Sequence, residues 1–306
     1  MKQPSTIDTL DRLEPGSRVA IIRLRSLGDC VLSTPAIHLL KGARPDLQIA
    51  VVAEDRFAPV FRNNPDISAV LPPRIGELRS FEPALCLNLH GGTRSARLTM
   101  LSGAGIKAGF DIFKPAWAYN TRIPTAQEVL GIDRRVHTAE HMAAAMFYLG
   151  VPIAEVPRAQ MYASANASNE PYAVLHPVAA TPEKAWPSSR FLEVADYIGQ
   201  RGIEPIFAAG PGDDLSPFKK WRTVSGAPLD EVAGLMRGAQ LFIGNDSGPA
   251  HVAAAFGVPE VVIFGPSDAE TWAPWRTKSA VLKAEGPIAR ITVGQVILAV
   301  NRVLQP

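Results

Sequence analysis

Short runs of apolar residues recur along the chain, and each is followed by a polar loop and then by a stretch with helical spacing. A run of four to eight such residues bounded by turn residues is typical of a strand that is buried on both faces of a sheet. Strands that alternate with helices predict a mostly parallel, doubly wound α/β sheet. The expected strands are residues 18–24, 47–54, 84–89, 107–110, 172–177, 204–210, 241–244 and 260–265.

The alternation of strands and helices is interrupted once. Residues 150–171 are rich in Pro, Ala, Ser and Asn and show little periodicity, which is typical of an interdomain connection. The alternation then starts again with similar spacing. We therefore predict two similar α/β domains, residues 1–160 and 161–290, followed by an amphipathic helix within residues 291–306.

Composition narrows the classes of protein. The 306 residues are 47% hydrophobic and 20% charged, as in a soluble globular protein. A net charge of +2 is too small to predict a nucleic-acid partner, but it is compatible with anionic small molecules or an anionic membrane surface. The two cysteines share no motif, and the polar N-terminal stretch lacks the apolar core of a signal peptide. No stretch approaches the ~20 apolar residues of a membrane span, so we expect a cytoplasmic protein.

Three polar loops each follow an expected strand, at the end of the strand where open α/β sheets bind ligands. They begin at Arg23, His176 and Asn245. The third, Asn-Asp-Ser-Gly-Pro, leads into an Ala-rich helix, and a helix N-terminus offers amides and a positive dipole end to a phosphate. Asp246 or Ser247 could equally serve only to cap that helix.

A nicotinamide dehydrogenase is disfavoured by the positions of the glycines. The letters of the dinucleotide fingerprint occur in "GAGIKA", but this stretch follows a helix and precedes a strand, which is the wrong order. "GPG" at residues 210–212 follows a strand but lacks the third glycine. No phosphate-loop, nucleophile-elbow or zinc-type spacing is present in the sequence either.

The three loops together resemble glycosyltransferase family 9, the heptosyltransferase family of bacterial lipopolysaccharide core assembly. The resemblance lies in "RLRSLGDCVLSTPAIHLLK", "HPVAATPEKAWPSSRFLEVADYI" and "GNDSGPAHVAAAFGVPEVVIFG", and it extends from about residue 18 to residue 264. It implies a GT-B fold, with two Rossmann-like domains that face a central cleft. It also implies a nucleotide-sugar donor on the C-terminal domain, an acceptor on the N-terminal domain, no metal, and a last helix that crosses back onto the first domain.

The resemblance gives the first loop a catalytic role. It implies that Asp29 is the general base and that Ser26 and Gly28 belong to the acceptor-side loop. A carboxylate is ionised at neutral pH and can accept the proton of an attacking hydroxyl. From the local pattern alone, a helix cap is the better explanation, because Ser26 and Asp29 have the spacing of a capping box.

The other two loops supply the expected donor site. The resemblance implies that Thr181 and Lys184 contact the phosphates, and that Lys184 offsets the charge that develops on the departing diphosphate. Asp246 would repel phosphate and is better suited to accepting hydrogen bonds from sugar hydroxyls or to fixing its own loop. The remaining expected donor-binding residues are Ser247, Gly248 and His251.

The leading hypothesis is an inverting, metal-independent glycosyltransferase that moves a heptose-like sugar from an ADP-sugar to a lipopolysaccharide-core or related glycolipid acceptor. We expect a monomer with no bound cofactor, no nucleic-acid partner and at most peripheral contact with the cytoplasmic face of the inner membrane. Two alternatives remain open: a GT-B-type nucleotide-sugar epimerase and a non-catalytic sugar-nucleotide-binding protein.

Overall fold

The computed structural model describes residues 9–164 and 170–305. The first eight residues, and part of the expected interdomain connection, lie outside the described residues. The chain divides into two compact units, Met1–Tyr162 and Ala163–Pro306, so the division lies close to the boundary expected at residue 160. Each unit is described by itself below.

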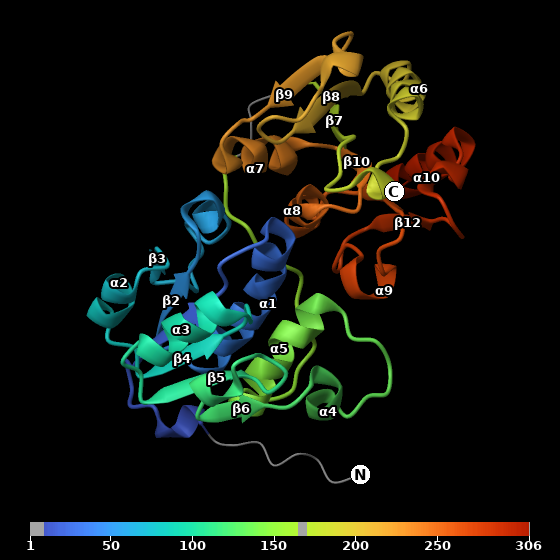
Figure 1. Ribbon diagram of the computed structural model, residues 1–306. Helices are drawn as coiled ribbons and strands as arrows, with labels where there is room; N and C mark the ends of the chain where they lie inside the picture. Colours follow the sequence, from blue (N-terminus) through green and yellow to red (C-terminus); the bar gives the residue numbers. More distant parts are fainter. Residues whose placement is uncertain (1–8, 165–169, 306) are drawn as a thin grey trace. The chain divides into compact units, whose positions relative to one another are not determined.

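The first unit is built on a parallel sheet of six strands in the order β3-β2-β1-β4-β5-β6 (Figure 1). The chain begins in the middle of the sheet, adds strands to one side and then adds strands to the other. This is the order of a Rossmann-like doubly wound domain. Its strands are β1 (Arg18–Ile22), β2 (Gln48–Val52), β3 (Ala69–Leu71), β4 (Leu85–Asn88), β5 (Ile106–Phe110) and β6 (Thr121–Ile123).

Two layers of helices accompany this sheet (Figure 1). Helices α1 and α5 pack against each other, while α2 and α3 supply Leu78 and Leu98 to a cluster with Ala20 and Ile22 of β1. Coverage on both faces explains why the central strands are continuous apolar runs. The helices are α1 (Leu27–Ala43), α2 (Ile75–Ser80), α3 (Thr93–Leu101), α4 (Ala126–Leu130) and α5 (Thr138–Leu149), with 3-10 turns η1 (Leu10–Arg12), η2 (Asp55–Val60) and η3 (Ala116–Ala118).

The second unit repeats this architecture. Its parallel sheet has the order β12-β11-β10-β7-β8-β9, which is the same order as in the first unit when counted from β7. The expected pair of similar α/β domains is therefore confirmed. The strands are β7 (Tyr172–His176), β8 (Glu204–Ala209), β9 (Arg222–Ser225), β10 (Leu241–Asn245), β11 (Glu260–Phe264) and β12 (Ser279–Lys283).

The helices of the second unit also form two layers (Figure 1). Helices α6 and α10 pack together, and α7 packs on α8, which contacts β10 and β11. The helices are α6 (Ser188–Gly199), α7 (Leu229–Gly238), α8 (Gly248–Phe256), α9 (Ala269–Trp272) and α10 (Val293–Leu304), with 3-10 turns η4 (Pro182–Lys184), η5 (Ser216–Phe218) and η6 (Ile288–Arg290). No helix in residues 9–164 or 170–305 is long and apolar enough to cross a membrane.

Within the second unit, the last helix α10 packs against α6, β11 and β12. Its Val296, Val300 and Val303 are buried in the same core cluster as Phe191 of α6. The physical reason is that this apolar stripe completes the cover of a sheet face that α6 alone leaves open. The expectation that residues 291–306 also cross back onto the N-terminal domain stays a prediction.

Glu260 is a buried acid at the start of β11. Its side chain is fully buried, and neither carboxylate oxygen has a hydrogen-bond partner within the described ranges. Burial without a compensating charge disfavours the ionised form, so the pKa of Glu260 is raised well above its ordinary value. The folded protein therefore binds this proton more tightly than the unfolded chain does.

Glu260→Gln is expected to change how the free energy of unfolding depends on pH. Because folding raises the pKa of Glu260, its protonated side chain contributes fully to the free energy of unfolding below the unfolded pKa of about 4.5. This contribution decreases as the pH rises above that value, and it is lost once the pH has risen through the folded pKa. Within that interval the wild type should lose about 1.4 kcal/mol per pH unit relative to the variant. Urea unfolding of both proteins from acidic to mildly alkaline pH measures this slope. A difference between the two proteins that is the same at every pH would contradict the prediction.

Candidate functional site

The predicted loops lie at corresponding places in the two sheets. In the first sheet β1 and β4 are neighbours. The strands that follow β1 are added on one side of this pair, and the strands that follow β4 are added on the other side. Strands β7 and β10 are arranged in the same way in the second sheet. Ligands of doubly wound domains bind beside the carboxyl ends of such strand pairs. The segment after β1 carries Asp29 at the start of α1, whereas the segments after β7 and β10 carry Lys184 and Asp246.

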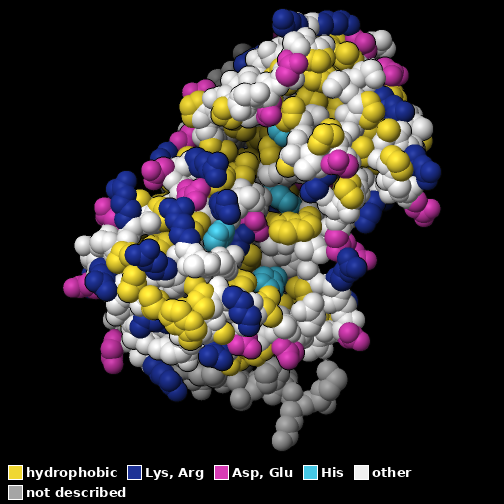
Figure 2. Space-filling view, in the orientation of Figure 1, with side chains coloured by type: hydrophobic (Ala, Val, Ile, Leu, Met, Phe, Trp, Pro, Cys, Tyr) yellow, Lys and Arg dark blue, Asp and Glu magenta, His cyan; other side chains and the backbone are white. Residues whose placement is uncertain are grey.

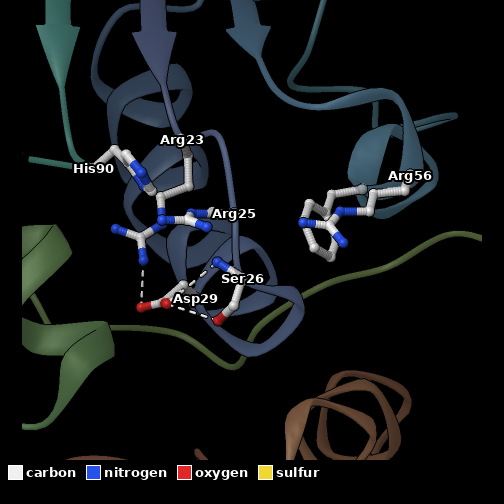
Figure 3. Close-up of a pocket in the computed structure, with 7 residues that line it drawn as sticks. Arg23, Arg25, Ser26, Asp29, Arg56 and His90 are labelled. Atoms are coloured by element: carbon white, nitrogen blue, oxygen red, sulfur yellow. Dashed lines mark hydrogen bonds and ion pairs between the residues drawn. The ribbon is translucent and has the colours of Figure 1, made fainter. Parts of the chain in front are cut away.

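A pocket of about 510 Å³ opens at this place in the first unit (Figure 3). It is formed by the loop after β1, the start of α1, the turn η2 after β2 and the end of β4. Three strand ends thus contribute to one concave site. Its lining residues are Arg23, Arg25, Ser26, Asp29, Arg56, Phe57 and His90.

Asp29 lies in the first turn of α1, and its side chain is 19% exposed. Its Oδ1 is paired with Arg23, and its Oδ2 accepts the hydroxyl of Ser26 at 2.8 Å and the backbone N–H of Ser26 at 3.4 Å (Figure 3). A carboxylate has about four acceptor positions, so one position on Oδ1 remains available. Gly28 is buried in the same turn and does not line the pocket.

Both explanations of Asp29 therefore find a basis in the geometry. The contact with Ser26 is of the capping type, as the spacing of the two residues suggested. A helix cap alone, however, does not account for the ion pair with Arg23 or for a position on the wall of a pocket. The role as general base stays a prediction.

Arg23 is a site residue that the sequence did not single out. Its side chain is only 7% exposed, it is paired with Asp29, and it donates from Nη1 to the carbonyl of Leu89 beyond β4. Its Nε has no partner among the described residues. Arg23 thus ties the loop after β1 to the end of β4 and holds Asp29 toward the pocket. Its only signal in the sequence is a cation placed directly after a buried strand.

The charge of the pocket is positive. The guanidinium of Arg56 lies 4.7 Å from the ring centre of Phe57 and forms an ion pair with Glu54 at 3.2 Å. The pKa of His90 is lowered, mainly by burial and then by Arg23 and Arg25, so this imidazole is neutral at neutral pH. Asp29 is the acid that lines the pocket, against three guanidinium groups, so the site favours an anionic ligand.

A second half-buried histidine lies near this pocket. His141 of α5 stacks on Phe110, with ring centres 4.1 Å apart. Burial, followed by the charge of Arg23, lowers the pKa of His141 to about 4, so its ring is neutral as well. The electrostatic balance near Asp29 is therefore set by arginines and not by protonated histidines.

The candidate donor site of the second unit centres on Lys184 and Asp246. Their side chains form an ion pair at 3.4 Å, with Lys184 33% and Asp246 10% exposed. The structure thus brings together two residues that are 62 positions apart. The lysine offsets the charge of an aspartate that would otherwise repel a phosphate.

Two neighbouring residues hold this pair in place. Asn245 is fully buried, donates to the carbonyl of Pro177 at 2.9 Å and accepts the N–H of Trp186 at 3.0 Å. A Cβ on Gly265 would lie 2.7 Å from the carbonyl oxygen of Glu183, so the absence of a side chain lets the turn before Lys184 approach the end of β11. Sequence reasoning missed both residues, because their roles depend on contacts distant in the chain.

The start of α8 differs from an ordinary capped helix. The helix begins at Gly248, and Ser247 occupies the cap position but its side chain makes no cap hydrogen bond. The Ser247 hydroxyl oxygen is buried and lacks a hydrogen-bond partner in the described part of the chain, while Asp246 turns to Lys184. Capping, the alternative considered from the sequence, is therefore not what these side chains do.

The remaining expected donor residues lie around this centre. Thr181 is exposed at the start of η4, and its carbonyl accepts the N–H of Lys184 at 3.1 Å. His251 lies in α8 and is only 4% exposed. Thr181 is therefore accessible to a ligand, whereas His251 is buried. The donor roles of these residues, and of Ser247 and Gly248, stay predictions.

Proteins with related sequences agree with the resemblance seen in the loops. Residues 76–290 match the family model described as Glycosyltransferase family 9 (heptosyltransferase). The chain is 28% identical over 295 residues to lipopolysaccharide heptosyltransferase 3 of Escherichia coli, in an alignment that covers 82% of this chain and 84% of that protein.

Solved structures share the fold. A glycosyl transferase family 9 protein from Veillonella parvula DSM 2008 has a TM-score of 0.81 at 24% identity, over 94% of this chain and 97% of that one. The E. coli heptosyltransferase WaaC with ADP has a TM-score of 0.78 at 20% identity, over 94% and 99% of the two chains. At these identities the likeness concerns the fold, and it confirms the predicted GT-B class.

Proposed function

This chain belongs to glycosyltransferase family 9 and is a glycosyltransferase, and we propose that it transfers a heptose-like sugar from an ADP-sugar donor to a glycolipid acceptor of the lipopolysaccharide-core type. The E. coli relative is named for heptose transfer in lipopolysaccharide assembly. WaaC, which shares the fold, was solved with ADP. These names supply the substrate classes of the proposal.

The observation that carries the proposal is the setting of Asp29. This carboxylate is held by Arg23 and Ser26, keeps one acceptor position on Oδ1, and lies on the wall of a positively charged pocket. A protein that only bound a nucleotide-sugar would not need a positioned proton acceptor. In the proposed step the acceptor hydroxyl attacks the anomeric carbon as the bond to the diphosphate breaks, and Asp29 takes the hydroxyl proton.

The charges of the two sites suggest which unit binds the acceptor and which binds the donor. Arg23, Arg25 and Arg56 around Asp29 favour an acceptor that carries an anionic group near the attacking hydroxyl. In the second unit, Lys184 and the amides at the start of α8 suit the diphosphate of the donor. Lys184 would then stabilise the charge that develops on the departing nucleoside diphosphate.

A nucleotide panel tests the donor. ADP and an ADP-sugar are expected to raise the melting temperature, whereas UDP, GDP and NAD should not. A ligand at 100 times its dissociation constant adds about 2.7 kcal/mol to the free energy of unfolding, which is readily measured. A response to UDP or NAD without one to ADP would refute the donor assignment.

The reaction itself separates the proposal from the two alternatives. A transferase releases ADP only when an acceptor is present and forms a product with inverted anomeric configuration. An epimerase would convert the donor alone, and a binding protein would convert nothing. Product analysis by NMR, with the donor incubated with and without de-acylated lipopolysaccharide core, distinguishes all three.

A further inference from the structure

The loop between β5 and β6, residues 111–120, exposes two large apolar side chains. We call it the Trp117 loop. Trp117 is 70% exposed and Ile112 is 57% exposed, whereas most large apolar residues of the unit are buried. Single exposed apolar residues are common on protein surfaces, but two large apolar side chains exposed in one loop call for an explanation.

Residues on both sides of Trp117 are held against the domain, so that the loop keeps Trp117 exposed. Before Trp117, Phe113 packs edge-to-face on Phe110 with ring centres 5.5 Å apart and lies against Gly91, where a Cβ would come within 2.9 Å of its ring. After Trp117, the hydroxyl of Tyr119 accepts a hydrogen bond from Asn88 at 2.8 Å. The loop is thus held on the domain while its tryptophan points outward.

Basic residues surround this loop. Arg94 and Arg97 lie on the exposed side of α3, which contacts η3 within the loop, and Lys114 and Arg122 are exposed in the loop and in β6. Figure 2 shows hydrophobic side chains over the region of α3 and β5, with Lys and Arg side chains among and around them.

Part of this positive charge is not balanced. Arg94 is paired with Glu54 at 2.8 Å, and Arg122 lies 3.9 Å from Asp111. Arg97 and Lys114 take part in no ion pair within residues 9–164 and 170–305. The surface therefore combines an outward aromatic side chain with excess cations.

We infer that the Trp117 loop and the basic side of α3 dock the first unit on an anionic phospholipid surface. Tryptophan prefers the interface between headgroups and acyl chains, and cations beside it gain from the negative potential of anionic lipids. A second copy of the chain suits the surface poorly, because two faces with the same excess of positive charge repel each other.

The biological role of this docking rests on the proposed function, since a glycolipid acceptor lies in a membrane. Docking would bring the pocket around Asp29 to the surface where such an acceptor is found. The two can nevertheless fail separately, because binding to vesicles requires neither donor nor catalysis.

The test is sedimentation of the full chain with vesicles of phosphatidylethanolamine and phosphatidylglycerol, compared with vesicles of phosphatidylcholine alone. The wild type is expected to bind the anionic vesicles and to be released by high salt. Trp117→Ser should weaken binding roughly tenfold or more, because the loss of an apolar anchor weakens partition. Arg97→Gln and Lys114→Gln should each weaken it about fivefold.

Leu298→Ser is the matched control, since Leu298 is also 70% exposed but belongs to α10 of the second unit. It should bind vesicles as the wild type does, and all variants should keep the wild-type melting temperature. The inference is overturned if the wild type does not bind anionic vesicles, or if Trp117→Ser binds them normally. It is also overturned if Leu298→Ser loses as much binding, or if ultracentrifugation without lipid shows a dimer that depends on Trp117.

Discussion

Asp29→Asn is expected to lower the transfer rate at saturating donor and acceptor by roughly 10²–10⁴-fold, the usual contribution of a general base. The amide has the size of the acid and keeps an oxygen for Arg23, but it cannot take the proton of the acceptor hydroxyl. Affinity for ADP, which we assign to the second unit, should not change. Steady-state transfer assays and ADP titration measure the two quantities.

The structure also predicts a cost in stability for this variant. Arg23 is buried and loses its charged partner, so the free energy of unfolding should fall by about 1–3 kcal/mol. A loss of stability therefore cannot by itself identify Asp29 as a mere cap. The transfer rate of the folded variant, measured well below its melting temperature, distinguishes the two roles.

Glu128 provides the matched control for the capping role. Thr125 donates its N–H and its hydroxyl to Glu128 at the start of α4, at 2.9 and 2.7 Å, as Ser26 does to Asp29. Glu128→Gln keeps an oxygen that can accept from Thr125, so it should have little effect on stability and leave transfer unchanged. If Asp29→Asn transfers sugar as well as Glu128→Gln does, Asp29 is only a cap, and the neutral His90 becomes the candidate base.

Lys184→Met should lower the transfer rate by about 10²–10³-fold, the typical cost of removing one group that stabilises developing charge. It should also weaken ADP binding, because the diphosphate loses its cation and meets Asp246 uncompensated. Lys184 is one-third exposed, so its ion pair contributes at most about 1 kcal/mol to stability. Calorimetric titration with ADP, together with the transfer assay, measures both effects.

Two further variants make this result specific. Lys220→Met removes a lysine of the same unit that is paired with Asp196, and it should leave transfer and ADP binding unchanged. The double variant Lys184→Met, Asp246→Asn removes the unpaired acid and should recover stability but not transfer. Unchanged ADP affinity in Lys184→Met would exclude Lys184 from the donor site.

The central strands of both sheets could be predicted from the sequence, whereas the edge strands could not. The eight expected strands are all present, because a strand that is buried on both faces has an unbroken run of apolar residues in its sequence. Strands β3, β6, β9 and β12 were missed. Their residues are mostly half-exposed or exposed, as in Arg222–Ser225, so their conformation depends on the neighbouring strand that supplies hydrogen-bond partners.

The candidate site was predictable to a similar degree. Asp29, Lys184 and Asp246 each lie in a loop after an apolar run, and the family resemblance selected them from the other polar residues of those loops. Arg23, His90 and Asn245 were missed as partners, since Arg23 meets Leu89 and Asn245 meets Pro177 only after distant strands become neighbours. No local spacing encodes such contacts.

The sequence by itself determined the two doubly wound α/β domains and the polar loops that follow their central strands, because each of these follows from burial patterns over a few consecutive residues. Only the tertiary structure decided which residues meet. The stripe of Val296, Val300 and Val303 shows that the last helix must cover an apolar face, but it does not say which one, and the helix packs on α6. The hydrophobic effect is not directional, so an apolar stripe can pack on any apolar surface. The surface that the last helix covers therefore depends on which sheet face the other elements leave exposed.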